Sequence, residues 1–116
     1  MSDPASFLPL TNTAFEILLA LAKEDLHGYA IIQSVVKRTG GGVKLHPGTL
    51  YRALARLLDI GLVDELDERP DPELDDERRR YYHLSELGRR VVLAEAERLA
   101  GQVRAARKLK FRESSR

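Results

Sequence analysis

Apolar side chains recur every three or four positions in the first third of the chain, which is the spacing of helices with one buried face. Thr13 and Glu16 have the spacing of a capping box, which predicts a first helix from this point to about Lys23. The residues that the pattern places on its buried face are Phe15, Leu18, Leu19 and Ala22. We expect this helix to pack against other helices rather than stand free.

A second helix is predicted after a turn at residues 24–28. Its apolar side would be formed by Ile31, Ile32, Val35 and Val36. The β-branched residues also permit a strand, but the alternation of a strand would leave neither face consistently apolar. Glycines at residues 40–42 then break the helix, and residues 43–45 are long enough for one short strand.

Pro47 predicts the start of a third helix, because the first helical position tolerates a residue without an amide hydrogen. The helix would extend to about Ile60, where Gly61 supplies the left-handed conformation that ends many helices. One face carries Leu50, Ala53, Leu54 and Leu57. The opposite face carries Gly48, Arg52, Ala55 and Asp59, flanked by Thr49, Tyr51 and Arg56. The third helix therefore exposes a small, polar and basic face.

Two short strands are predicted at residues 62–66 and 79–84, joined by a polar loop that contains Pro70 and Pro72. Ser85 can then cap a final helix that runs to about Lys110, and about 25 residues at 1.5 Å each would span about 38 Å. Its apolar residues follow the 4-3-4-3 spacing of helices that pack along their lengths. These residues, the predicted dimer interface, are Val92, Ala96, Leu99, Val103 and Ala106.

This long helix predicts a homodimer, because the three preceding helices are too short to cover it. The alternative is packing within one chain with a frayed end, since residues 107–116 are polar. The order of elements predicts a mainly α fold with a small β-hairpin, as in a winged helix-turn-helix domain whose third helix enters the major groove of DNA. We expect a DNA-binding domain at residues 1–84 and a dimerisation helix with its tail at residues 85–116, together forming one compact unit.

Charge is distributed unevenly along the 116 residues, although the net charge is only +1. Residues 64–77 carry a net charge of −8, whereas residues 78–116 carry a net charge of +8. An acidic loop therefore adjoins a basic strand and helix, and the local field says more about partners than the average charge does.

The composition argues against several kinds of site. The chain has no cysteine, so it can form neither a disulfide nor a thiolate metal site. Its apolar segments are shorter than the roughly 18 residues of a membrane span, and residues 1–10 lack a signal-peptide pattern, so we expect a cytoplasmic protein. The three histidines lack a metal-binding spacing, and the serines lack a hydrolase motif. We expect no metal, no cofactor and no enzymatic activity.

Five motifs stand out along residues 8–110. They are His27-Gly28-Tyr29, the run Pro47-Gly48-Thr49-Leu50-Tyr51-Arg52-Ala53-Leu54, the pair Arg56-Leu57, Gly61-Leu62-Val63, and Arg79-Arg80-Tyr81-Tyr82-His83-Leu84-Ser85. This combination at this separation resembles the PadR family of transcriptional regulators. The resemblance implies a dimeric repressor that binds double-stranded DNA and releases it when a small apolar or aromatic effector binds. A single C-terminal helix resembles the compact branch of that family.

Candidate DNA contacts lie on and around the third helix. Arg52 can donate two hydrogen bonds to O6 and N7 of guanine, so it is predicted to read a base. Gly48 and Thr49 allow close approach of the backbone and offer a hydroxyl group. The other candidates here are His46, which precedes the helix where the family often has serine, Pro47, Tyr51, Arg56 as a phosphate contact, and Tyr29 at the start of the second helix. The two tyrosines could instead be core aromatics with a hydrated edge.

The second strand adds a basic run at residues 78–80. Because phosphates would repel the acidic loop, we expect the strand arginines Arg78 and Arg80, rather than the loop tip, to contact DNA. Arg78 could equally neutralise the acidic loop. For Tyr81 and Tyr82, the alternation of a strand predicts that one ring points into the core and the other points out.

An effector would most simply occupy apolar space between the first and last helices at the dimer interface, by analogy with the fold. The candidate residues are Phe15, Leu19, Leu87 and Val91, each of which also makes sense as ordinary core. The competing functional hypothesis is a winged-helix protein-interaction module whose acidic loop binds a basic partner.

Overall fold

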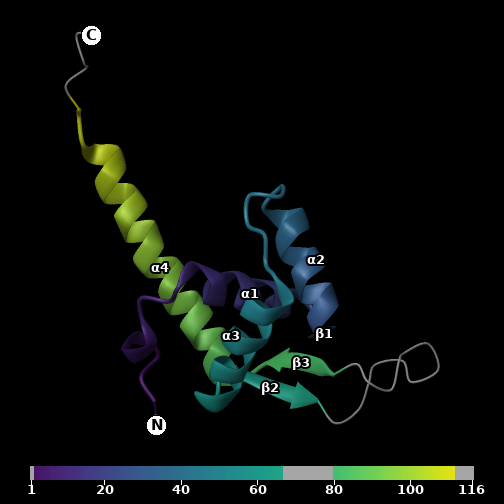
Figure 1. The fold of residues 1–116 in the computed structure, drawn as a ribbon. Coiled ribbons are helices and arrows are strands. Elements are labelled where there is room, and N and C mark those ends of the chain that lie inside the picture. Colours follow the sequence, from purple (N-terminus) through teal and green to yellow (C-terminus); the bar gives the residue numbers. More distant parts are fainter. Residues whose placement is uncertain (1, 67–79, 112–116) are drawn as a thin grey trace.

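The computed structural model describes residues 2–66 and 80–111 of the chain (Figure 1). Its elements, in chain order, are the 3-10 turn η1 (Pro4–Phe7), α1 (Asn12–Lys23), β1 (Leu26–His27), α2 (Gly28–Arg38), α3 (Pro47–Asp59), β2 (Val63–Leu66), β3 (Tyr81–Leu84) and α4 (Glu86–Lys108). Figure 1 shows α1 beside the first half of α4 and α2 on the other side of α1, while the second half of α4 extends away from the other elements. The predicted mainly α fold with a small β-hairpin is confirmed, and a third strand joins the hairpin.

The sheet has β3 at its centre, with β2 on one side and β1 on the other, and both pairings are antiparallel. The β2–β3 pair is the predicted hairpin. Strand β1 was not predicted, because two residues are too short to display an alternating pattern. The predicted short strand at residues 43–45 is wrong: the hydroxyl of Thr39 accepts the amide of Val43 at 3.1 Å, and Leu45 is buried in the core next to α3.

Helix α1 begins earlier than its capping-box pattern predicts. The side chain of Thr11 accepts the amide of Ala14 at 3.1 Å, so Thr11 is the N-cap and Thr13 already lies inside the helix. The fully buried side chains are Ile17, Leu18, Ala20 and Leu21, whereas Phe15 and Leu19 are half-buried and Ala22 is exposed. The predicted face was therefore only partly correct, because α1 is covered on several sides, by α2, α3, α4 and β3.

Helices α2 and α3 follow their predicted bounds closely. Ile31 and Val35 of α2 are fully buried, but Val36, predicted on the same face, is exposed. Helix α3 ends as predicted, with Gly61 at a φ of 82°. The amides of Gly61 and Leu62 donate to carbonyl groups of the last helical turn at 3.2 Å and 3.0 Å. These carbonyl groups thereby gain hydrogen-bond partners, as in a Schellman motif.

Helix α4 starts at the predicted cap and ends two residues earlier than predicted. The Ser85 hydroxyl accepts the amide of Gly88 at 2.9 Å and donates to the carbonyl of Gly61 at 2.6 Å, which ties the start of α4 to the end of α3. Gly88 packs so closely against Leu62 that an added β-carbon would lie 2.1 Å from the Leu62 carbonyl oxygen. Within residues 2–66 and 80–111, no helix is long and apolar enough to span a membrane.

A buried carboxylate fastens the N-terminal arm, residues 2–11, to α4. Glu95 is only 1% exposed, and its Oε2 accepts the amide of Leu10 at 2.9 Å and a hydrogen bond from Arg98 at 3.1 Å. The hydrogen bond from Arg98 holds the pKa of the Glu95 carboxyl below its ordinary value of 4.5; burial opposes this shift, and the Leu10 amide adds to it. The ionised form of Glu95 is therefore the one that suits the fold.

The lowered pKa of Glu95 predicts a pH-dependent contribution to stability. A carboxyl whose pKa is lower in the folded than in the unfolded state stabilises the fold above about pH 4.5, and this contribution is lost as the pH falls through the folded-state pKa. Glu95→Gln should lower the free energy of unfolding by about 2 kcal/mol at pH 7 and by much less near pH 3. Denaturant unfolding at both pH values measures the difference.

The matched control for this experiment is Glu97→Gln. Glu97 lies on the same helix, but its side chain is 78% exposed in its ion pair with Arg104. We expect this substitution to change stability little at either pH. An equal loss for Glu95→Gln at the two pH values would contradict the assignment of Glu95 as an ionised anchor.

Candidate nucleic-acid interface

The polar face of α3 is exposed, and Leu50, Leu54 and Leu57 are buried on its other side, as predicted. Nη2 of Arg52 lies 3.5 Å from Oγ1 of Thr49, and a β-carbon on Gly48 would lie 3.4 Å from Nη1 of Arg52. The Arg52 side chain therefore lies along the first turn of α3, over Gly48. Because Gly48 has no side chain, the guanidinium of Arg52 has room beside the exposed start of the helix.

The start of α2 touches this face through a tyrosine. The hydroxyl of Tyr51 packs against Gly28, where an added β-carbon would lie only 2.3 Å from the phenol oxygen. Tyr51 remains 51% exposed, and Tyr29 beside Gly28 is 62% exposed. Both tyrosines therefore present accessible rings where α2 and α3 meet, rather than filling the core.

The sequence does not show why position 28 is a glycine. His27-Gly28-Tyr29 forms part of a motif, but the contact of Gly28 with Tyr51, 23 positions away, leaves no periodic signal. The Nδ1 atom of His27 accepts the amide of Ala30 at 3.2 Å and so caps α2 directly before the glycine. Cap and close contact together fix the start of α2 against α3.

Two further candidates, His46 and Pro47, stand at the start of α3. His46 is the exposed N-cap residue, and Pro47 occupies the first helical turn, also exposed. Together with Gly48 and Thr49 they make the N-terminal end of α3 accessible. The amide groups and positive dipole end of a helix favour an anion at such a terminus.

The hairpin contributes Arg80, the first described residue after the loop. Its Nη1 lies 3.5 Å from Glu65 on β2, and its side chain is largely exposed. Arg78, Arg79 and the acidic loop, and with them both predicted roles of Arg78, lie outside the described residues. On β3, Tyr82 is buried, and burial is the main cause that raises the pKa of its phenol. The inward ring is thus Tyr82.

The outward tyrosine, Tyr81, packs on β1. Its ring meets the imidazole of His27 edge-on, with centroids 5.3 Å apart. Two positions further along β3, Nδ1 of His83 lies 2.7 Å from a carboxylate oxygen of Asp25, just before β1. These contacts hold the central strand of the sheet to the start of α2, and so to the tyrosine pair.

The predicted effector residues lie in or beside the core of the single chain. Val91 is fully buried, and Phe15, Leu19 and Leu87 are half-buried against the core. On the predicted dimer seam of α4, Val92 is buried and Leu99 is half-buried, while Ala96, Val103 and Ala106 are exposed. The second half of the seam is therefore uncovered in the single chain.

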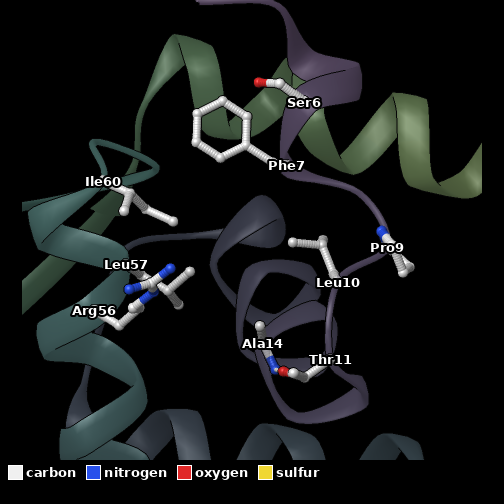
Figure 2. Close-up of a pocket in the computed structure, with 9 residues that line it drawn as sticks. All are labelled: Ser6, Phe7, Pro9, Leu10, Thr11, Ala14, Arg56, Leu57 and Ile60. Atoms are coloured by element: carbon white, nitrogen blue, oxygen red, sulfur yellow. Dashed lines mark hydrogen bonds between the residues drawn. The ribbon is translucent and has the colours of Figure 1, made fainter.

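A pocket of about 420 Å³, here called the arm pocket, lies between the N-terminal arm, the start of α1 and the end of α3. It is lined by Ser6, Phe7, Pro9, Leu10, Thr11, Ala14, Arg56, Leu57 and Ile60. Figure 2 shows Phe7 and Leu10 of the arm facing Leu57 and Ile60 across this space. Sequence reasoning did not predict the pocket, because the arm carries no helical or strand pattern. The residues that the structure describes contain no group of three His, Asp or Glu side chains able to hold a metal ion.

The chain is similar to a known protein family. The model of the transcriptional regulator PadR-like family matches residues 17–94, which include the exposed face of α3 and the start of α4. An uncharacterized 37.1 kDa protein in transposon Tn4556 of Streptomyces fradiae is 40% identical over 90 residues, or 75% of this chain. The aligned region is 24% of that protein's length, so the chain spans about a quarter of this relative.

Solved structures match most of the chain. The structure of an hsRosR-S4 complex, RosR being a protein of H. salinarum, is 27% identical with a TM-score of 0.70, covering 86% of this chain and 80% of that one. A PadR family transcription regulator from Clostridium difficile is 23% identical with a TM-score of 0.69, covering 84% and 97%. At this identity the second match supports the fold alone.

Proposed function

The chain belongs to the PadR-like family of transcriptional regulators, and from this premise we propose that it binds DNA sequence-specifically and represses transcription. The observation that carries the proposal is the outward face of α3. Arg52 lies over Gly48 beside the hydroxyl of Thr49, at the exposed start of the helix. An arginine in this position on a recognition helix can bind O6 and N7 of one guanine in the major groove.

The groups around Arg52 suit the DNA backbone. Tyr29 and Tyr51 expose their rings where α2 meets α3, and phenol hydroxyl groups commonly donate to phosphate oxygens. His46 and the amides at the start of α3 can approach a phosphate on the same side. Arg80, on the hairpin, retains an exposed guanidinium despite its ion pair with Glu65. In this arrangement phosphate contacts orient α3 and Arg52 supplies discrimination between bases.

Gel-shift titration tests this proposal against DNA from upstream of the protein's own gene, at several salt concentrations. Specific binding should weaken steeply as salt rises, because phosphate contacts release counterions. A shuffled sequence of equal composition is the control. Equal affinity for both DNAs would refute sequence-specific binding and favour the alternative, a winged-helix module that binds a basic protein.

Repression is a separate claim with its own test. A reporter gene placed behind the same upstream DNA should be expressed more strongly when the regulator's gene is deleted, and complementation should restore the low level. Lower expression after deletion would instead identify an activator. We further propose that a small apolar or aromatic effector relieves the repression, by binding more tightly to a conformation of the protein that does not bind DNA.

A homodimer would place two copies of α3 on two half-sites of the operator. The uncovered half of the α4 seam supports this dimer, since Val103 on it is 47% exposed in the single chain. A single C-terminal helix in each subunit would then form the interface, as proposed for the compact branch of the family. Val103→Glu should then convert the dimer to monomers at micromolar concentration, because a carboxylate in an apolar interface would be desolvated without a partner. Light scattering measures the mass.

Gln102→Glu is the matched control, since it adds the same charge one position off the seam. We expect that variant to remain dimeric. A monomeric unmodified protein, or a dimer that tolerates Val103→Glu, would contradict the predicted seam formed by Val92, Ala96, Leu99, Val103 and Ala106.

A further inference from the structure

The arm pocket has the size and shape of a small-molecule site. Its volume of about 420 Å³ lies within the range of roughly 300–1,000 Å³ that is usual for ligand pockets. Most of its surface is apolar, because Phe7 and Leu10 of the arm face Leu57 and Ile60 of α3 (Figure 2). Such walls would bind the hydrocarbon body of a ligand by removing it from water.

The positive charge in the lining of the arm pocket favours a ligand with an anionic group. The one ionisable lining residue is Arg56, and among residues 2–66 and 80–111 its guanidinium takes part in none of the ion pairs. Thr11, the N-cap of α1, also lines the pocket, so the positive end of that helix dipole lies at the same place. Guanidinium groups bind carboxylates through two parallel hydrogen bonds.

We propose that the arm pocket binds a medium-chain carboxylate, with its carboxylate on Arg56 and its hydrocarbon chain between the arm and α3. The site differs in position from the apolar space predicted between α1 and α4, because it lies between the arm, the start of α1 and the end of α3 and has Arg56 in its lining. A neutral molecule of the same length would leave the guanidinium without its partner.

The pocket is placed to affect both halves of the molecule. Arg56 lies one helical turn after Arg52 on α3 and is a proposed phosphate contact, so a carboxylate on Arg56 would compete with DNA. Leu10 lines the pocket, and its amide donates to Glu95 of α4 at 2.9 Å, so the arm joins the ligand to the proposed dimerisation helix. This regulatory consequence rests on the proposed DNA-binding function, whereas the binding site itself does not.

Calorimetric titration of the full chain with octanoate tests the site without DNA. We expect one octanoate bound per chain, and binding at least about tenfold weaker for 1-octanol, which has the chain without the charge, and for acetate, which has the charge without the chain. Arg56→Gln should also weaken octanoate binding about tenfold. No saturable binding of octanoate, or equal binding of 1-octanol, would overturn the proposal.

Filling the pocket gives a second test that keeps its charge. Ala14 lines the pocket from the first turn of α1, so Ala14→Leu should weaken octanoate binding at least about tenfold. Ala22→Leu is the matched control, because Ala22 is exposed near the other end of the same helix. Thermal unfolding verifies that both variants fold. Unchanged octanoate affinity in a folded Ala14→Leu variant would overturn the assignment.

The regulatory consequence is measured by adding octanoate to the protein–DNA complex. Octanoate should raise the apparent Kd for the operator in the unmodified protein and in Ala22→Leu, but not in Ala14→Leu, which should otherwise bind DNA normally. If the protein bound no DNA specifically, the proposed function would be wrong. Calorimetry would still show whether the arm pocket binds octanoate, because that titration contains no DNA. Specific DNA binding without octanoate binding would overturn the pocket alone.

Discussion

Replacing Arg52 by alanine is expected to weaken binding to the operator by about 1–3 kcal/mol and to make binding less selective at one base pair of each half-site. The loss follows from removing the only exposed arginine beside the start of α3 in the described part of the chain, where its guanidinium lies over Gly48. Fluorescence anisotropy measures the affinity for the operator and for variants with each base pair changed in turn.

The control for Arg52→Ala is Arg90→Ala. Arg90 is also an exposed helical arginine, but it lies on α4 and pairs with Glu86 one turn away at 3.6 Å. We expect its removal to change neither the affinity nor the pattern of preferred bases. If Arg52→Ala weakened binding to all sequences equally, Arg52 would be a phosphate contact rather than the residue that reads a base.

The largest expected effect on stability comes from Gly88→Ala. Its β-carbon would lie 2.1 Å from the Leu62 carbonyl oxygen and 2.7 Å from Cδ1 of Leu84, and the first of these is backbone that cannot rotate away. An alanine in a helix normally stabilises by up to about 1 kcal/mol relative to glycine. Overpacking outweighs this gain, so we expect a net loss of about 2–4 kcal/mol in the free energy of unfolding, measured by denaturant titration.

Gly101→Ala provides the matched control on the same helix. An added β-carbon there would meet nothing closer than the mobile end of Arg104, at 3.7 Å. This substitution should therefore raise stability by about 0.5–1 kcal/mol through helix propensity alone. If the two substitutions had effects of the same sign, the close approach of α4 to Leu62 would not be what requires glycine at position 88.

The sequence predicted those elements whose cause is local. Pro47 and Gly61 set the bounds of α3 through the backbone conformation of single residues, and the periodicity of leucines defined its buried face. Ser85 predicted the start of α4 because its hydroxyl can accept an amide of the first helical turn. In each case the physical cause acts within about one helical turn, so it can be recognised in a short stretch of sequence.

The features that the sequence did not predict depend on contacts between distant segments. Strand β1 exists because β3 provides its hydrogen-bonding partners, and the arm pocket exists because Glu95 holds Leu10 in place from 85 positions away. The close contact of Gly28 with Tyr51 is of the same kind. Thr11, rather than the predicted Thr13, is the N-cap of α1. The two hydroxyl groups lie two residues apart and offer similar local signals, so the sequence does not distinguish them. The path of the arm does.

In the proposed complex the outward face of α3 reads base edges in the major groove, with Arg52 on a guanine. Methylation interference tests this contact, because a methyl group on N7 of guanine blocks the hydrogen bond that the arginine would make there. We expect interference at one guanine in each half-site, with the two half-sites separated by about one helical turn of DNA or a multiple of it. In Arg52→Ala this interference should disappear. Interference absent from guanine N7, or unchanged in Arg52→Ala, would show that Arg52 does not read a guanine.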